Sequence, residues 1–185
     1  SQIFAAGERG LVAYWSFDRK DAPQMDYSGN EKKLNLFGCR WVEGICGGAI
    51  VLQEGSYAVC ASYDDVLFIF PSDYTIELWV RHSARNPQCY LSKWTGRGDE
   101  SAWWIGYYEN KVQFGDYFDG GQVRISGTDI ADGKWHHVVG VRRNRHLELF
   151  IDGKCLGRKK SPAMLAGYNS APVLLSNRTG WTFHG

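Results

Sequence analysis

The sequence predicts an all-β domain built from two stacked antiparallel sheets. Short runs rich in β-branched and aromatic residues recur along the chain, which is typical of strands. Turn signals separate many of these runs, as at Asp132-Gly133 and Asp152-Gly153. No stretch longer than about ten residues keeps the apolar period of a helix. Two stacked antiparallel sheets are the simplest way to bury so many short strands.

The predicted strands cover residues 11–17, 49–52, 74–81, 102–108, 112–114, 122–126, 135–141, 147–151 and 173–176. Side chains alternate between the two faces of a strand, so each run can be divided into two sets. In the run 74–81, we expect an aliphatic set in the core and a mixed polar and aromatic set on the other face. These sets are Ile76, Leu78 and Val80, and Glu77, Trp79 and Arg81.

Length and composition indicate one folded domain, which we take to span residues 1–185. The chain has 21 Lys and Arg against 20 Asp and Glu, so no broad field would attract nucleic acid or an anionic membrane. Aromatic residues make up 15% of the chain, which argues against disorder. No apolar run reaches the roughly 20 residues of a membrane-spanning helix, so membrane insertion is not expected.

The five cysteines show no Cys-x-x-Cys pairing, which argues against a structural zinc site. In an exported protein, Cys39 and Cys46 could close a short loop, and Cys60 could meet Cys89 or Cys155 between strands. One cysteine would then stay unpaired. The alternative is that all five are small buried hydrophobic residues in a reducing compartment.

Several segments together resemble a known family in their order and spacing. They are GLVAYWSFD at 10–18, DYSGN at 26–30, GAIVL at 48–52, YTIELWV at 74–80, DGKWHHV at 132–138, LELFIDG at 147–153 and VLL at 173–175. The chain resembles the laminin-G-like domains of the concanavalin A-like lectin/glucanase superfamily over residues 10–185. This resemblance implies a two-sheet antiparallel jelly-roll β-sandwich and an extracellular or cell-surface location.

Domains of this family usually continue with one more strand after a segment like Phe183-His184-Gly185. The resemblance therefore implies a fragment of a longer secreted protein, a closing strand that is absent, or an edge covered by residues 1–6. An uncovered edge would invite strand addition by a protein partner.

Enzymatic activity has little support in the sequence. Retaining glycosidases of this broad fold need two carboxylates about 5 to 5.5 Å apart. The nearest approach is Glu148 and Asp152, and we expect Asp152 to begin a turn. His136 and His137 are adjacent on a predicted strand, so they point to opposite faces and cannot share a metal. We therefore expect no catalytic residues.

Calcium is the cofactor that the family resemblance implies, as a structural ion at the rim of the sandwich. Asp99 and Asn177 occupy positions similar to its usual ligands. Asp26 is a further candidate in an early loop, although the segment 26–30 equally fits an Asx-turn. Asn177-Arg178-Thr179 also forms a glycosylation pattern, and a glycan would exclude calcium from Asn177.

The best indication of ligand binding lies in residues 90–108, where aromatic residues mix with charged ones around a glycine-bearing loop. Aromatic rings pack on the apolar faces of sugars, while charged groups bond to hydroxyl or acidic substituents. The candidate ligand-binding residues are Trp94, Arg97, Trp104, Tyr108 and Tyr117. Alternation separates residues 103, 105 and 107 from residues 104, 106 and 108, and at least one set should be core.

Two functions fit these observations. The first is a non-catalytic carbohydrate-binding or adhesion module whose partner is a polysaccharide or glycoconjugate. The second is a protein-interaction or structural module of a surface assembly, bound through an open sheet edge. A sugar-binding module requires an exposed cluster of aromatic and polar groups, whereas an assembly module requires an open edge or an apolar patch.

Overall fold

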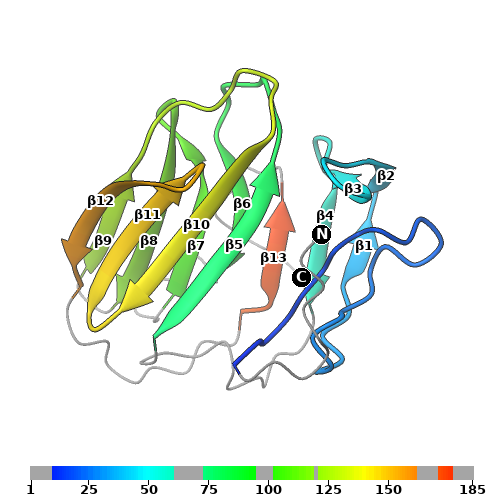
Figure 1. The fold of residues 1–185 in the computed structure, drawn as a ribbon, viewed down its shortest axis with the longest axis horizontal. Coiled ribbons are helices and arrows are strands. Elements are labelled where there is room, and N and C mark those ends of the chain that lie inside the picture. Colours follow the sequence, from blue (N-terminus) through cyan, green and yellow to red (C-terminus); the bar gives the residue numbers. More distant parts are fainter. Residues whose placement is uncertain (1–9, 61–72, 95–101, 119–120, 162–170, 177–185) are drawn as a thin grey trace.

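A computed structural model describes residues 10–60, 73–94, 102–118, 121–161 and 171–176 as an all-β fold (Figure 1). The strands are β1 (Asn35–Phe37), β2 (Arg40–Glu43), β3 (Gly48–Val51), β4 (Tyr57–Cys60), β5 (Tyr74–Val80), β6 (Gln88–Lys93), β7 (Ala102–Tyr108), β8 (Lys111–Phe118), β9 (Gly121–Ser126), β10 (His136–Arg143), β11 (His146–Ile151), β12 (Lys154–Lys160) and β13 (Val173–Ser176). In these residues there is no helix of the length and apolar character needed to cross a membrane.

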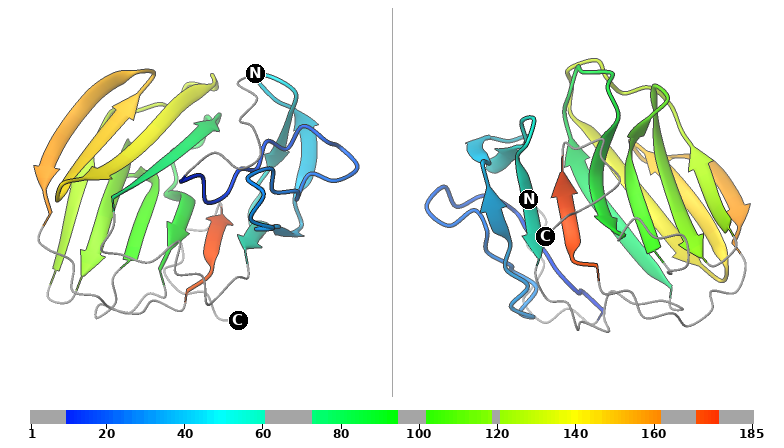
Figure 2. Two further views of the ribbon diagram at one scale, coloured as in Figure 1. Left: turned by 60° about the horizontal axis from the view of Figure 1, so that its bottom comes forward. Right: turned by 180° about the vertical axis from the view of Figure 1, so that it is seen from behind.

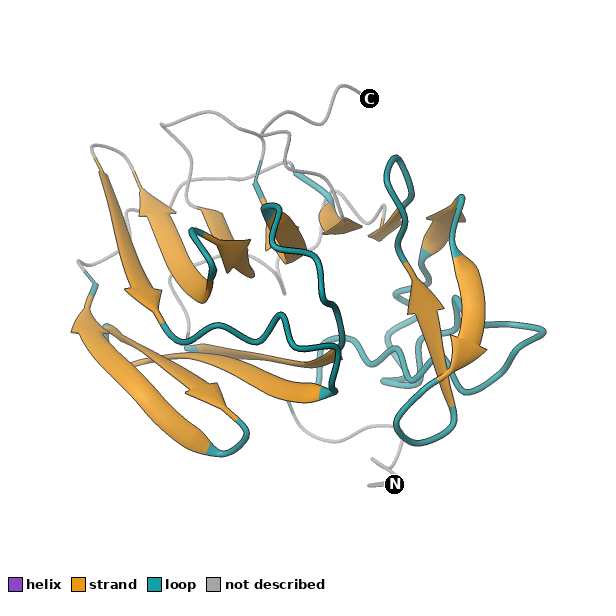
Figure 3. Cartoon of the chain, turned by 90° about the horizontal axis from the view of Figure 1, so that it is seen from above, coloured by secondary structure: helices purple, strands orange, loops and turns teal. Residues whose placement is uncertain are grey.

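The strands form two antiparallel sheets and a separate hairpin. The large sheet has the order β1-β4-β13-β6-β7-β8-β9, and the small sheet has the order β12-β11-β10-β5. Strand β13 joins distant parts of the sequence, because it lies between β4 and β6 (Figure 2). Strands β2 and β3 pair only with each other among the described residues. The sheets lie as two layers (Figure 3), which confirms the predicted β-sandwich.

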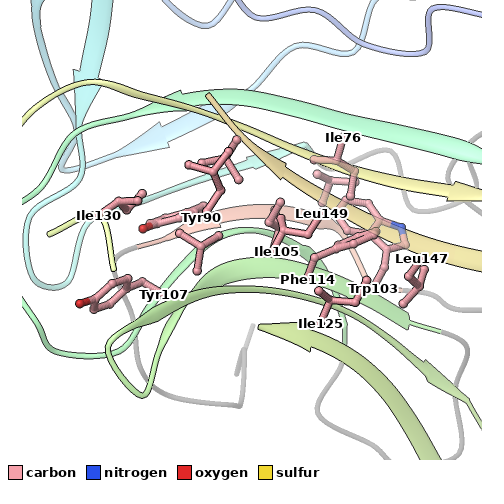
Figure 4. Close-up of a cluster of buried hydrophobic side chains, with 14 of the residues drawn as sticks. Ile76, Tyr90, Trp103, Ile105, Tyr107, Phe114, Ile125, Ile130, Leu147 and Leu149 are labelled. Carbon is pink, nitrogen blue, oxygen red and sulfur yellow. The ribbon is translucent and has the colours of Figure 1, made fainter. Parts of the chain in front are cut away.

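The hydrophobic core lies between the two sheets (Figure 4). Strand β7 contributes Trp103, Ile105 and Tyr107, and β8 contributes Val112 and Phe114. The facing residues of the small sheet are Ile76, Val138, Leu147 and Leu149. The alternation predicted for residues 74–81 is confirmed, since Ile76 is buried while Trp79 on the opposite face is 49% exposed.

The structure departs from the predicted strands at residues 11–17, which form no strand despite their strong β-propensity. The Asp26 carboxylate accepts the Tyr14 backbone N–H at 2.9 Å, and the Trp15 indole donates to the Lys32 carbonyl at 2.6 Å. The backbone N–H of Tyr14, which a strand would offer to a neighbouring strand, is therefore bonded to a side chain of the following loop. The Trp15 indole fixes the segment to the same loop.

All five cysteines are free, so the structure contains neither disulfide considered for an exported protein, and Cys46 and Cys155 are exposed rather than buried. Cys60 faces the core, whereas the β6–β7 register places Cys89 opposite Gly106 on the outer face of the large sheet. Cys155 lies opposite Phe150 in the small sheet and is exposed. The Cys39 thiol donates to the Tyr57 carbonyl at 3.2 Å, while Cys46 is exposed in the β2–β3 hairpin.

A buried ion pair connects the two sheets. Arg142 of β10 donates through Nε to the carboxylate of Asp116 of β8 at 2.9 Å, and the side chains are 1% and 0% exposed. The Tyr74 hydroxyl donates to the same carboxylate at 2.5 Å, and the Ser161 hydroxyl does so at 3.3 Å. Burial raises the pKa of Asp116, while the bonds from Tyr74 and Arg142 oppose that rise. Two strands of the small sheet are thus bonded to one carboxylate of the large sheet.

Breaking this pair should destabilise the fold strongly. We expect Arg142→Met to lower the free energy of unfolding by about 3 to 5 kcal/mol, because it leaves a buried carboxylate without its cation. Chemical denaturation measures this loss. The matched control is Arg143→Met, next in sequence but exposed, which should change stability by less than about 0.5 kcal/mol. Equal effects of the two substitutions would contradict the structural role of the pair.

At the end of the small sheet opposite the Arg142 ion pair, His136 connects the turn at Asp132 with the turn at Asp152. Its Nδ1 lies 2.8 Å from Asp152, and its Nε2 lies 3.1 Å from Asp132. Carboxylates only accept hydrogen bonds, so both contacts are satisfied only when the imidazole is protonated. Burial lowers the pKa of His136, but the bonds to Asp152 and Asp132 outweigh burial, and the net pKa is raised.

The contribution of His136 to stability should therefore depend on pH. Because its pKa is raised in the folded state, the stabilisation is fully present below the ordinary histidine pKa of about 6.5. It is lost as pH rises through the folded-state pKa. We expect the stability difference between wild type and His136→Gln to be larger at about pH 5.5 than at about pH 8.5. Denaturant titrations at both pH values measure it, and a pH-independent difference would contradict the protonated bridge.

Candidate functional site

The outer face of the large sheet carries most of the predicted ligand-binding residues. Since Trp103, Ile105 and Tyr107 fill the core, alternation directs Trp104 and Tyr108 to the outer face. This confirms that one of the two sets on this strand is core. The same alternation directs Tyr117 outward, because its neighbour Asp116 is bonded to Arg142 between the sheets.

Two of the predicted aromatic residues stack against each other. The ring centroids of Trp94 and Tyr117 are 4.7 Å apart, and the ring planes differ by 15°. Ala102 pairs with Tyr117, and extending the pairing of Lys93 with Trp103 by one residue places Trp94 opposite Ala102. The methyl side chain of Ala102 leaves room for the rings to meet above the intervening strand.

Trp104 lies on the same outer face as the stacked rings, two residues from Ala102 on β7. It is 4% exposed, so it offers a ligand little surface. It lies against two positions without side chains, because a Cβ at Gly106 would come within 3.1 Å of its ring carbon Cζ3, and one at Gly115 within 3.2 Å of Nε1. Trp94, Tyr108 and Tyr117 are half-buried and thus keep surface for contact with a ligand.

Arg124 adds a charged group that the sequence reasoning missed. It pairs with Gly115 across β8 and β9, which places it on the same outer face. Burial raises the pKa of Tyr117, whereas the Arg124 charge opposes this rise. The alternating run 122–126 could have indicated Arg124, but only the register places it beside Tyr117. The site therefore combines aromatic rings with a guanidinium group.

Among the described residues, Cys89 on this face is not activated, and the groups considered for enzymatic chemistry, which lie on the small sheet, have other partners. Burial raises the pKa of Cys89 to about 11, so its thiol stays protonated at neutral pH. The two carboxylates considered for glycosidase chemistry have partners elsewhere: Glu148 pairs with Arg158 at 3.2 Å, and Asp152 contacts His136. His137 instead contacts Glu77 at 2.8 Å, on the opposite face from His136.

The candidate calcium ligand Asp26 is engaged in contacts within its own loop. Asp26 uses both carboxylate oxygens to accept backbone bonds from Tyr14, Ser28 and Lys32 and a side-chain bond from Ser28. These contacts correspond to the Asx-turn alternative. No group of three or more His, Cys, Asp or Glu side chains suited to a metal occurs in the part of the chain that the structure describes. Asp99 and Asn177, like Arg97, lie outside that part.

Fold and site together define a two-sheet β-sandwich with a partly exposed aromatic cluster on one outer face. The laminin G family model described as the concanavalin A-like lectin/glucanases superfamily matches residues 54–185. The chain therefore belongs to this superfamily, as its sequence resemblance implies. No curated protein matches the sequence.

Solved structures agree with this assignment. Domain 4 of an extracellular arabinanase from Geobacillus stearothermophilus, in complex with arabinotriose, is 18% identical with a TM-score of 0.67, and the match covers 91% of this chain and 84% of that one. The binding domain of Paraclostridial Mosquitocidal Protein 1 is 19% identical with a TM-score of 0.68, over 82% of this chain and 41% of that one. The binding domain of botulinum neurotoxin DC, in complex with rat synaptotagmin II, is 17% identical with a TM-score of 0.64, over 82% and 40%.

At these identities the likeness establishes the fold alone. The chain spans about two fifths of the length of the toxin binding domains, at 41% and 40%. It spans most of the arabinanase domain, at 84%.

Proposed function

We propose that this domain is a non-catalytic carbohydrate-binding module of an extracellular protein. The observation that supports it best is the stacked pair Trp94 and Tyr117 beside Arg124 on the outer face of the large sheet. Partly exposed rings suit the apolar faces of sugars, and a guanidinium suits hydroxyl or carboxylate groups. The arabinanase domain, whose structure contains arabinotriose, is similar over nearly all of this chain. Laminin-G-like membership supports the extracellular location.

A second candidate function is protein interaction through a sheet edge. Strand β5 lies at the end of the small sheet and pairs only with β10 among the described residues. Such an edge can accept a strand from a partner. The toxin binding domain in complex with synaptotagmin supports a protein ligand for a related sandwich.

Trp94→Ala should weaken glycan binding about ten-fold or more, because it removes one of the partly exposed rings. A glycan and polysaccharide array identifies the ligand, and titration calorimetry then measures affinity. Trp79→Ala is the matched control, since Trp79 is 49% exposed but lies on the small sheet. Circular dichroism would verify that both variants are folded. Equal losses in the two variants, or no glycan bound by wild type, would favour the protein-interaction alternative.

The calcium expectation rests on Asp99 and Asn177 and is tested separately. The array is repeated with millimolar calcium and with a chelator. A structural ion should make thermal stability and binding fall together on chelation, and Asp99→Ala should remove that sensitivity. Unchanged stability on chelation would exclude a structural calcium ion.

A further inference from the structure

One end of the small sheet concentrates positive charge in a chain whose formal net charge is only +1. We call this region the basic corner, and it consists of Arg143, Arg145, Lys159 and Lys160. All four residues are exposed. They come from the end of β10, the turn into β11 and the end of β12.

Strand register brings two of these cations, Arg143 and Lys160, to one face of the sheet, whereas Lys159 pairs with the core residue Leu147 and lies on the other face. Arg143 pairs with His146, and His146 pairs with Lys160, so Arg143 and Lys160 flank one residue on the same face. Arg143 and Lys160 are thus two strands apart, at about 4.7 to 4.9 Å for each step between strands. The Arg145 carbonyl accepts the Ser161 backbone N–H at 2.8 Å, which holds the turn against the end of β12.

Two neighbouring cations have acidic partners, whereas the basic corner has none among the described residues. Arg142 is paired with Asp116 inside the sandwich, and Arg158 is paired with Glu148. Within the described ranges, none of the four cations of the basic corner has an acidic ion-pair partner. The nearby acid Asp73 accepts the Asn144 backbone N–H at 3.0 Å. Arg143 and Lys160 therefore present two positive charges to solvent on one face of the sheet, on either side of His146, where an acidic ligand could contact both.

We propose that the basic corner binds the sulfate or carboxylate groups of an acidic polysaccharide. Arginine forms bidentate bonds to such groups, and lysine supplies additional charge. The choice of a polysaccharide over other polyanions rests on the proposed function. The site itself is separate from the aromatic cluster, because Arg143 and Lys160 lie on the small sheet and Trp94 and Tyr117 lie on the large one. One domain would thus hold sugar rings on one sheet and acidic substituents on the other.

The test compares dextran sulfate with dextran, which differ in charge but share a sugar backbone. We expect saturable binding of the domain to dextran sulfate, weakened about ten-fold or more in Arg143→Ala/Lys160→Ala at low salt. The plot of log affinity against log salt concentration should also become flatter in this variant, because fewer counterions are displaced. The control is Lys134→Ala/Lys154→Ala, which removes the same charge from two exposed lysines near the opposite end of the small sheet.

The outcomes separate this inference from the proposed function. Loss in the basic-corner variant alone, with binding retained in Trp94→Ala, supports an acidic-glycan site that is independent of the aromatic cluster. If the domain binds dextran sulfate but no neutral glycan, the acidic-glycan site of the basic corner remains supported. The proposed sugar-binding site on the large sheet then loses its support. Equal losses in both charge variants would overturn the inference. Tighter binding to duplex DNA or to phosphatidylserine vesicles than to dextran sulfate would overturn the assignment of a polysaccharide.

Discussion

The buried contact between Asp116 and Arg142 constrains the register of both sheets. Each residue points between the layers, and each carries a charge that is stable there only with its partner. A strand that slipped by one residue would turn Asp116 outward and bury Tyr117 instead. The same argument holds for Arg142, because a slip of β10 would turn Arg143 inward. The outward positions of the aromatic cluster and of the basic corner therefore both depend on one interior ion pair.

Much of the architecture could be predicted because alternation is local and strong in the central strands. Residues 102–108 and 147–151 form strands as predicted, and both have core side chains on one face only. The prediction missed five strands, β1, β2, β4, β6 and β12. Strand β12 is mostly polar and exposed, and its place in the sheet comes from pairing with β11. Such strands are specified by their neighbours and not by propensity.

The sequence named residues of the candidate site but not their arrangement. The mixture of aromatic and charged residues drew attention to Trp94, Trp104 and Tyr117, which the structure places on one face of the large sheet. Their arrangement depends on details with no signal in a single strand, such as Ala102 lying between the stacked rings. Arg124 was missed for the same reason, since it reaches the site only through the pairing of β8 with β9. Register decides which distant side chains become neighbours.

The two outer faces of the sandwich differ because each strand has only one face to give to the core. In β8, filling the core with Val112 and Phe114 leaves Gly115 and Tyr117 for the outer surface. The glycine lets Trp104 lie close to the sheet, and that position supports a half-buried aromatic surface. In β10, a core filled by Val138 and Arg142 leaves Arg143 outside, where no acid of the described residues pairs with it. The same alternation between core and outer side chains therefore gives an aromatic outer face on the large sheet and a cationic corner on the small sheet. Because these outer side chains are not part of the core, substitutions there should leave the core packing intact.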